Sequence, residues 1–269
     1  MNKDAVKYIN KEEYSFEDLC GIMKLLRGEG GCPWDREQTH ESIRKNLIEE
    51  TYEVVEAIDR RDAALMCEEL GDLLLQVVFH SEMSEEDGKF GITQVVSGIC
   101  RKLIYRHPHI FADVSADTSE KVLENWDRLK VAEKHRDTLY DQMKAVPPSL
   151  PALMRADKVG KKAGKANFDF SCFEETMAKV DEEAAELREA AESGDSARMA
   201  DEAGDLLFAA VCAARKLGVE PEEALTRATD KFVSRFGRLE SAAALTGRQV
   251  SELTPAEADA IWESIKNCD

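Results

Sequence analysis

The sequence predicts an all-α protein made of two tandem helical-bundle domains. The strongest observation is an internal repeat: residues 47–79 match residues 180–212 at 14 of 33 positions, with a constant offset of 133 residues. Helical periodicity and strong helix formers dominate, most clearly in residues 173–192, 197–217 and 222–244. Alternating apolar and polar residues, which are typical of strands, are scarce. A duplicated helical unit is therefore expected.

Two stretches rich in glycine or proline interrupt the helical pattern. Residues 27–34 contain three glycines and a proline, and residues 146–151 contain three prolines. The second stretch lies between the repeats, so we predict domains at 1–145 and 146–269, each large enough to bury its own core. Short turns between about four helices per repeat favour antiparallel bundles with inward-facing carboxylates. Pairing that completes these cores could occur between the repeats or between two chains, and the sequence leaves both open.

Composition restricts the partners and the compartment. The formal net charge of −18 argues against binding to nucleic acid or to an anionic membrane, because both require basic patches. The seven cysteines form no Cys-x-x-Cys and are odd in number, which argues against a disulfide framework or a zinc ribbon. Neither a signal peptide nor an apolar run of membrane-spanning length is evident. We expect a cytoplasmic protein that contacts neither membranes nor nucleic acid.

Each copy of the repeat carries four carboxylates in Glu-x-x-Glu and Glu-x-x-Asp pairs. The two sets are Glu50, Glu53, Glu69 and Asp72 in the first copy, and Glu183, Glu186, Glu202 and Asp205 in the second. Residues three apart lie on one face of a helix, so the four oxygen ligands of each set could converge. Such ligands suit Mg²⁺, with Mn²⁺ as a substitute. The competing interpretation is that they are solvated surface charges.

The neighbours of the aspartates favour the metal interpretation. Asp72 and Asp205 lie in runs of apolar residues, so we expect them to be substantially buried, which is costly for a carboxylate without a partner or a metal. Gly71 and Gly204 precede them, and a glycine inside a helix costs about 1 kcal/mol relative to alanine. These glycines therefore predict that another helix approaches closely.

Cations and a tryptophan follow each acidic set. Lys102 and Arg106 are echoed by Lys231 and Arg235, and tryptophans follow at Trp126 and Trp262. The cations could be solvated and the tryptophans could be core residues. Beside a metal cluster, however, cations would bind polyphosphate oxygens and a tryptophan could stack on a base. The combination suits a nucleotide.

The order of the motifs resembles the MazG family of nucleoside triphosphate pyrophosphohydrolases over nearly the whole chain. The first copy contributes Cys32-Pro33-Trp34-Asp35, Gln38-Thr39-His40, Glu49-Glu50-x-x-Glu53, Glu69-Leu70-Gly71-Asp72 and Arg106-His107-Pro108-His109-Ile110-Phe111. The second contributes Lys158-Val159-Gly160-Lys161-Lys162-Ala163, Asn167-Phe168-Asp169-Phe170 and its acidic set. These latter motifs are similar to the tandem form of the family.

This resemblance implies an all-α fold of the nucleoside triphosphate pyrophosphohydrolase type and a Mg²⁺-dependent enzyme that produces a nucleoside monophosphate and pyrophosphate. It also implies a homodimer, and a role in nucleotide-pool house-cleaning or stress. By motif, Glu183, Glu186, Glu202 and Asp205 would hold metal, and Lys179, Lys231, Arg235 and Trp262 would bind the nucleotide. The second copy is the expected main catalyst. The first copy could be catalytic, regulatory or architectural. Glu182 and Glu49 adjoin the ligands and are candidate general bases, although the residues leave open whether the protein supplies a base at all.

The sequence also bears on three other classes of protein: di-iron bundles, P-loop NTPases and non-catalytic modules. A di-iron bundle needs two Glu-x-x-His motifs, and the chain has one, at 37–40. A P-loop NTPase needs Gly-x-x-x-x-Gly-Lys-Ser/Thr, which is absent from the sequence. The alternative outside enzymes is an acidic helical interaction or regulatory module that keeps the fold without significant catalysis. The intact ligand sets in both copies disfavour it.

Overall fold

The structure is a computed structural model that describes residues 3–9, 11–112 and 138–267, together with residues 118, 121, 122, 125, 126 and 129. The predicted all-α fold is confirmed, because these residues form helices and turns and no strand. None of the described helices combines the length and the apolar character that crossing a membrane requires. Contacts divide the chain into two compact units, Met1–Lys130 and Val131–Asp269.

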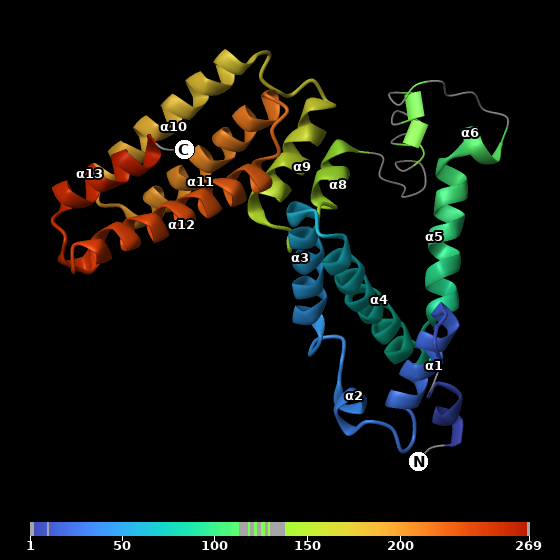
Figure 1. Cartoon of the computed structure of the whole chain (residues 1–269). Coiled ribbons are helices and arrows are strands. Elements are labelled where there is room, and N and C mark those ends of the chain that lie inside the picture. Colours follow the sequence, from blue (N-terminus) through green and yellow to red (C-terminus); the bar gives the residue numbers. More distant parts are fainter. Residues whose placement is uncertain are drawn as a thin grey trace. The chain divides into compact units, whose positions relative to one another are not determined.

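The first unit is organised around a long helical hairpin. Its helices are η1 (Lys3–Lys7), α1 (Phe16–Arg27), α2 (Pro33–Glu37), α3 (Arg44–Arg60), α4 (Ala63–Glu86), α5 (Ile92–Arg106) and α6 (Pro108–Phe111). Helices α3 and α4 pack along each other, and α1 and α5 contact α4 (Figure 1). Its core lies between α1 and the second half of α4, where these residues pack together: Met23, Ile43, Val78, Phe79 and Met83.

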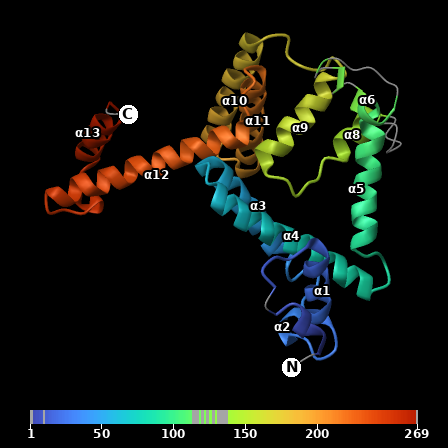
Figure 2. The same ribbon diagram turned by 45° about the vertical axis from the view of Figure 1, so that its right-hand side comes forward.

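The second unit also has a helical hairpin with shorter and longer helices around it. Its elements are α8 (Leu139–Lys144), α9 (Ala152–Gly164), α10 (Phe173–Ser193), α11 (Ser196–Lys216), α12 (Pro221–Leu245), η2 (Val250–Glu252) and α13 (Pro255–Lys266). Helices α10 and α11 form the most extensive helix pair in the unit, and α9 contacts both α11 and α12. Figure 2 shows α12 projecting from the α10/α11 hairpin, with α13 beside its far end.

The two hairpins turn in the same way, which extends the sequence repeat to local geometry. Each first helix ends at a residue in the left-handed region, Arg61 (φ 54°) or Gly194 (φ 72°). An aspartate follows at once and caps the next helix: the Oδ1 atoms of Asp62 and Asp195 each accept hydrogen bonds of 3.0–3.2 Å from two backbone N–H groups. Such a cap contributes about 1 kcal/mol. The turn therefore fixes how the two ligand-bearing helices meet.

The two compact units divide after Lys130. Helix α8 packs on α9 and belongs to the second unit. The predicted domain boundary after residue 145 stays a prediction.

The expectation of close helix approach at Gly71 and Gly204 is wrong for the described residues, because a Cβ atom built at either position meets nothing within 4 Å. Both glycines are exposed among the described residues of their units.

Candidate metal and nucleotide site

The acidic site of the second unit is built by the α10/α11 hairpin. Glu183 and Glu186 lie one turn apart on α10, and Glu202 lies on α11. Because the capped turn at Asp195 sends α11 back along α10, these three side chains converge. Each offers a carboxylate oxygen, and the three oxygens lie within 4.8 Å of one another. The hairpin thus brings together three of the four metal ligands predicted for this copy.

Glu183 is the most buried member of this set. Glu183 is only 5% exposed, and its Oε1 lies 2.6 Å from Nζ of Lys179, one turn earlier on α10. Its Oε2 is buried and has no hydrogen-bond partner among the described residues. Lys179 also bonds to Glu182 at 2.8 Å, and these bonds to Glu182 and Glu183 raise the pKa of Lys179. A buried carboxylate oxygen without a partner is costly, and a hard cation would satisfy it.

Glu186 and Glu202 are the other two members of this set, and their negative charges repel each other. Burial raises the pKa of Glu186, with further contributions from the neighbouring Glu202 and Glu183 carboxylates. Glu202 is partly neutralised by Arg198, whose Nε lies 3.3 Å from its Oε1. Three converging carboxylate oxygens suit a hard cation such as Mg²⁺ or Mn²⁺, and the set contains no sulfur or imidazole ligand. The residues present therefore fit the metal that the family resemblance implies.

The prediction that Asp72 and Asp205 are substantially buried is wrong: both residues are exposed. The neighbouring apolar residues are exposed too, and Leu207, for example, is 57% exposed. An apolar run around a helix therefore does not by itself show which of its side chains are buried. Asp205 lies outside the cluster of three but lines the adjacent cavity with Glu183, so it remains beside the site.

The first unit gathers a corresponding but different set of three. Oxygens of Glu50, Glu69 and Asp72 lie within 4.8 Å of one another, with Glu50 on α3 and the other two on α4. Glu53 is exposed and outside this set. Burial raises the pKa of Glu50, followed by its interaction with the Glu53 side chain and by the charge of Asp72. Burial, and then the charge of Glu53, also raises the pKa of Glu69. The less buried first set has no equivalent of Lys179, because Asn46 occupies that position.

A cavity of about 710 Å³ opens beside the acidic site of the second unit. Lys179, Glu183 and Asp205 form one part of its wall. The rest comes from α8, α9, the loop at 167–170, α10 and α11, and is lined by Met143, Val159, Gly160, Ala163, Asn167, Phe168, Asp169, Phe170, Glu175, Phe208, Ala209, Cys212 and Arg215. The site therefore combines a cluster of hard ligands with a mostly apolar recess of ligand size.

The predicted nucleotide-binding residues on α12 and α13 are placed elsewhere. Lys231 and Arg235 lie one turn apart on α12, and Trp262 of α13 packs against Phe232, with ring centroids 5.2 Å apart. None of these residues is among those that line the cavity. In the first unit the equivalent Arg106 lies over Trp126, 5.1 Å from the ring centroid. The tryptophan therefore contacts the cation in the first copy and a phenylalanine in the second, and the described residues of the second unit do not bring Lys231, Arg235 or Trp262 to the cavity beside the acidic cluster.

Sequence reasoning missed two contributors to this region. Arg198 holds Glu202 from one turn earlier on α11, an i,i+4 spacing that could have been noticed. The second is the ion pair between Asp169 and Arg215, which are 46 residues apart and carry no short-range signal. Both lie on or next to the α10/α11 hairpin and help to fix the shape of the site.

Comparison with known proteins identifies relatives for both halves and for the whole. The family model of the MazG nucleotide pyrophosphohydrolase domain matches residues 38–111, and that of phosphoribosyl-ATP pyrophosphohydrolase matches residues 158–231. The nucleoside triphosphate pyrophosphohydrolase of Escherichia coli K12 is 41% identical over 251 residues, which are 92% of this chain and 95% of that protein. The nucleoside triphosphate pyrophosphohydrolase/pyrophosphatase MazG of Thermotoga maritima is 42% identical over 254 residues, 94% of this chain and 96% of that protein.

Proposed function

Since this chain belongs to the MazG family of nucleoside triphosphate pyrophosphohydrolases, we propose that it hydrolyses nucleoside triphosphates to the monophosphate and pyrophosphate with Mg²⁺ at the second acidic set. The observation that carries this proposal is the convergence of Glu183, Glu186 and Glu202, with one buried Glu183 oxygen that lacks a partner. In a module that binds no cation, this buried and unpartnered oxygen would only be destabilising. Removal of unwanted nucleotides from the pool is the role that we propose for this activity.

The residues of the second unit have separable tasks in this reaction. Glu183, Glu186 and Glu202 would hold Mg²⁺, with Asp205 as a further ligand beside them. When bound, the ion would neutralise the phosphates that four carboxylates otherwise repel and would activate water. Lys179, now paired with Glu183, can donate instead to a phosphate oxygen when the metal takes over that carboxylate.

The reaction places a water opposite the leaving pyrophosphate. Attack on the α-phosphorus forms a new P–O bond and breaks the bond to the α,β-bridging oxygen, which leaves with pyrophosphate. Glu182 is exposed, adjoins Glu183 and hydrogen-bonds Lys179 at 2.8 Å, so it is our candidate to accept the proton of that water. Lys231 and Arg235 would then stabilise the negative charge of the transferred and leaving groups.

We further propose that two copies of the chain pair through the uncovered face of the second hairpin. Leu207 on α11 and Phe232 and Val233 on α12 are all exposed, and the exposed Gly204 leaves room for a helix to approach. A partner chain would cover these apolar side chains and could bring its own Lys231 and Arg235 to the acidic set. Light scattering should give the mass of a dimer, and Leu207→Glu should produce a monomer with little activity. A fully active monomer would contradict this part of the proposal.

Product identity is the decisive test of the activity. Purified protein is incubated with a panel of nucleoside triphosphates and Mg²⁺, and the released phosphorus species are separated by chromatography. We expect pyrophosphate and the monophosphate in equal amounts, and no turnover after chelation. Orthophosphate as the primary product, or full turnover in chelator, would refute the assignment.

A further inference from the structure

One motif of the second copy has no task in the proposed metal site. The residues Lys158-Val159-Gly160-Lys161-Lys162-Ala163 and Asn167-Phe168-Asp169-Phe170 precede the acidic set in sequence. In the structure they form the end of α9 and the loop that follows it, and seven of these residues line the 710 Å³ cavity. A motif that shapes a cavity next to ligand-bearing carboxylates suggests a role in binding.

The loop at 167–170 is held in a defined conformation. Asn167 adopts a left-handed backbone (φ 58°), and its N–H donates to the carbonyl of Gly164 at 3.0 Å. The next N–H, of Phe168, donates to the carbonyl of Ala163 at 3.2 Å. Asparagine is one of the few residues other than glycine that tolerates this conformation. The helix therefore ends in a fixed turn that presents Phe168.

An ion-pair cluster fastens the other end of the loop to α11. Arg215 binds Asp169 in a bidentate manner, with Nη1–Oδ2 at 2.8 Å and Nη2–Oδ1 at 2.7 Å. Lys216 lies 2.9 Å from Asp169 Oδ2 and also donates to the carbonyl of Phe170. These bonds hold the pKa of Asp169 well below its ordinary value, and the bond from Arg215 has the largest effect. A Cβ atom at Gly160 would lie 3.2 Å from Nε of Arg215, so glycine suits this close approach.

The fixed loop leaves an aromatic ring in water at the rim of the cavity. Phe168 is 81% exposed, whereas Phe170, two residues later, is half-buried, and both line the cavity. An exposed phenylalanine is common on protein surfaces. Here it lies on a tethered loop at the mouth of a recess whose wall includes Lys179, Glu183 and Asp205.

We propose that this cavity, the nucleoside pocket, binds the base and sugar of the nucleoside triphosphate, with Phe168 stacking on the base. The inference rests on the proposed function, because it assumes that the triphosphate binds at the acidic set. The nucleoside is attached to the α-phosphate of that triphosphate, and the nucleoside pocket adjoins the acidic set because Glu183 and Asp205 line its wall. Stacking on an aromatic ring tolerates every base, since each has a π-face. The pocket is also of the size that small-molecule sites have.

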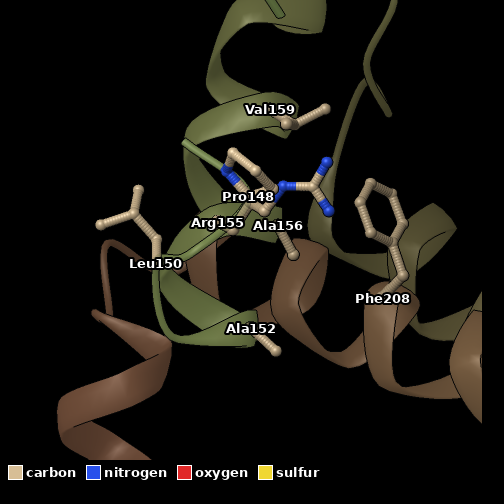
Figure 3. Close-up of a pocket in the computed structure, with 7 residues that line it drawn as sticks. All are labelled: Pro148, Leu150, Ala152, Arg155, Ala156, Val159 and Phe208. Carbon is tan, nitrogen blue, oxygen red and sulfur yellow. The ribbon is translucent and has the colours of Figure 1, made fainter. Parts of the chain in front are cut away.

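A smaller neighbouring cavity is a poorer candidate for the nucleoside. It measures about 300 Å³ and is lined by Pro148, Leu150, Ala152, Arg155, Ala156, Val159 and Phe208 (Figure 3). None of the carboxylates of the acidic set lines it, and it shares only Val159 and Phe208 with the nucleoside pocket. A nucleoside there would have no direct connection to the acidic set.

The test compares a triphosphate analogue that carries a nucleoside with a triphosphate that carries none. Isothermal calorimetry on the full chain with Mg²⁺ measures Kd for α,β-methylene-ATP, whose α,β bond cannot be hydrolysed, and for inorganic tripolyphosphate. The variants are Phe168→Ala, Phe168→Trp and, as a matched control, Phe90→Ala, an exposed phenylalanine of the first unit. Because binding is measured without turnover, a failure of the proposed reaction would appear only in the product assay.

We expect Phe168→Ala to weaken binding of the nucleotide analogue by about tenfold, the scale of one lost base–aromatic stack, and to leave tripolyphosphate unchanged. Phe168→Trp should retain or improve binding of the analogue, and Phe90→Ala should match wild type. An unchanged Kd for the analogue in Phe168→Ala would overturn the proposal. Equal weakening of both ligands would overturn it too, because the loop would then act on the phosphates or on the fold.

Discussion

Replacing Glu183 by glutamine should remove the stabilisation that Mg²⁺ gives to the protein while leaving the metal-free protein nearly as stable as wild type. The substitution keeps the side-chain volume in a site that is 5% exposed, so no cavity forms. It removes the ion pair with Lys179, whose contribution to stability is small because solvent screens the partly exposed ammonium group. It also removes the cost of burying an oxygen without a partner. These two effects oppose each other in the metal-free state.

The metal-bound state should respond much more strongly. At free Mg²⁺ about a hundredfold above Kd, binding to the folded state alone stabilises it by about 2.7 kcal/mol. For a chain of this size each kcal/mol raises Tm by roughly 2–4 °C, so the wild type should gain roughly 5–10 °C. Circular dichroism melts of the full chain, with and without Mg²⁺, measure this difference. Glu192→Gln, an exposed position on the same helix, is the matched control and should behave as wild type.

The result that would refute this reasoning is specific. If Glu183→Gln keeps the full Mg²⁺-dependent rise in Tm, the metal does not bind at the second acidic set. If the metal-free variant instead loses several kcal/mol, the buried carboxylate is a structural ion pair, and its oxygen without a partner is no evidence for a ligand.

Three further outcomes are expected. Glu183→Ala should remove most pyrophosphate release and Glu50→Ala less, because the first set is less buried; kcat/KM for ATP measures both, and the reverse order would move the main catalyst to the first unit. Arg235→Ala should lower kcat/KM by roughly a hundredfold with Tm near wild type, the scale of one lost charge-stabilising donor, and unchanged kinetics would remove this residue from the site. Burial, followed by the charge of the adjacent His40, lowers the pKa of His80 below its ordinary value of 6.5. The neutral His80 side chain therefore stabilises the folded state fully above pH 6.5, and this stabilisation is lost as the pH falls through the lowered pKa. Melts from pH 5 to 8 should show this loss in wild type and not in His80→Leu, and a loss that persists in the variant would assign it to other groups.

The sequence predicted those features that depend on local pattern. Helical periodicity, the 133-residue offset and the Glu-x-x-Glu spacing are properties of neighbouring residues, and the helical hairpins and most of the acidic clusters follow from them. Asp62 and Asp195 are likewise readable as helix caps from their positions before apolar-periodic segments. Local rules therefore cover most of the path from sequence to the metal site.

The errors and omissions arise where distant segments decide the outcome. Asp205 has apolar neighbours on nearly every side, yet which face of α11 is covered depends on residues distant in sequence, and Asp205 is exposed among the described residues of its unit. The nucleoside pocket depends on Asp169 meeting Arg215 across 46 residues, which no periodicity encodes. The sequence did contain one indication of this pocket: an aromatic residue, Phe168, lies between Asn167 and Asp169 in a segment outside the helical pattern.

The four carboxylates of the second set lie within a single helical hairpin, between positions 183 and 205. A gene segment that encodes this hairpin therefore carries the whole set of predicted metal ligands, so one duplication can create a second ligand set without assembling it from dispersed residues. After duplication, each copy is free to change its surroundings while the other maintains the activity. The same contiguity makes the hairpin a transplantable part: grafted onto another antiparallel helix pair of equal turn length, it should carry its cation affinity with it.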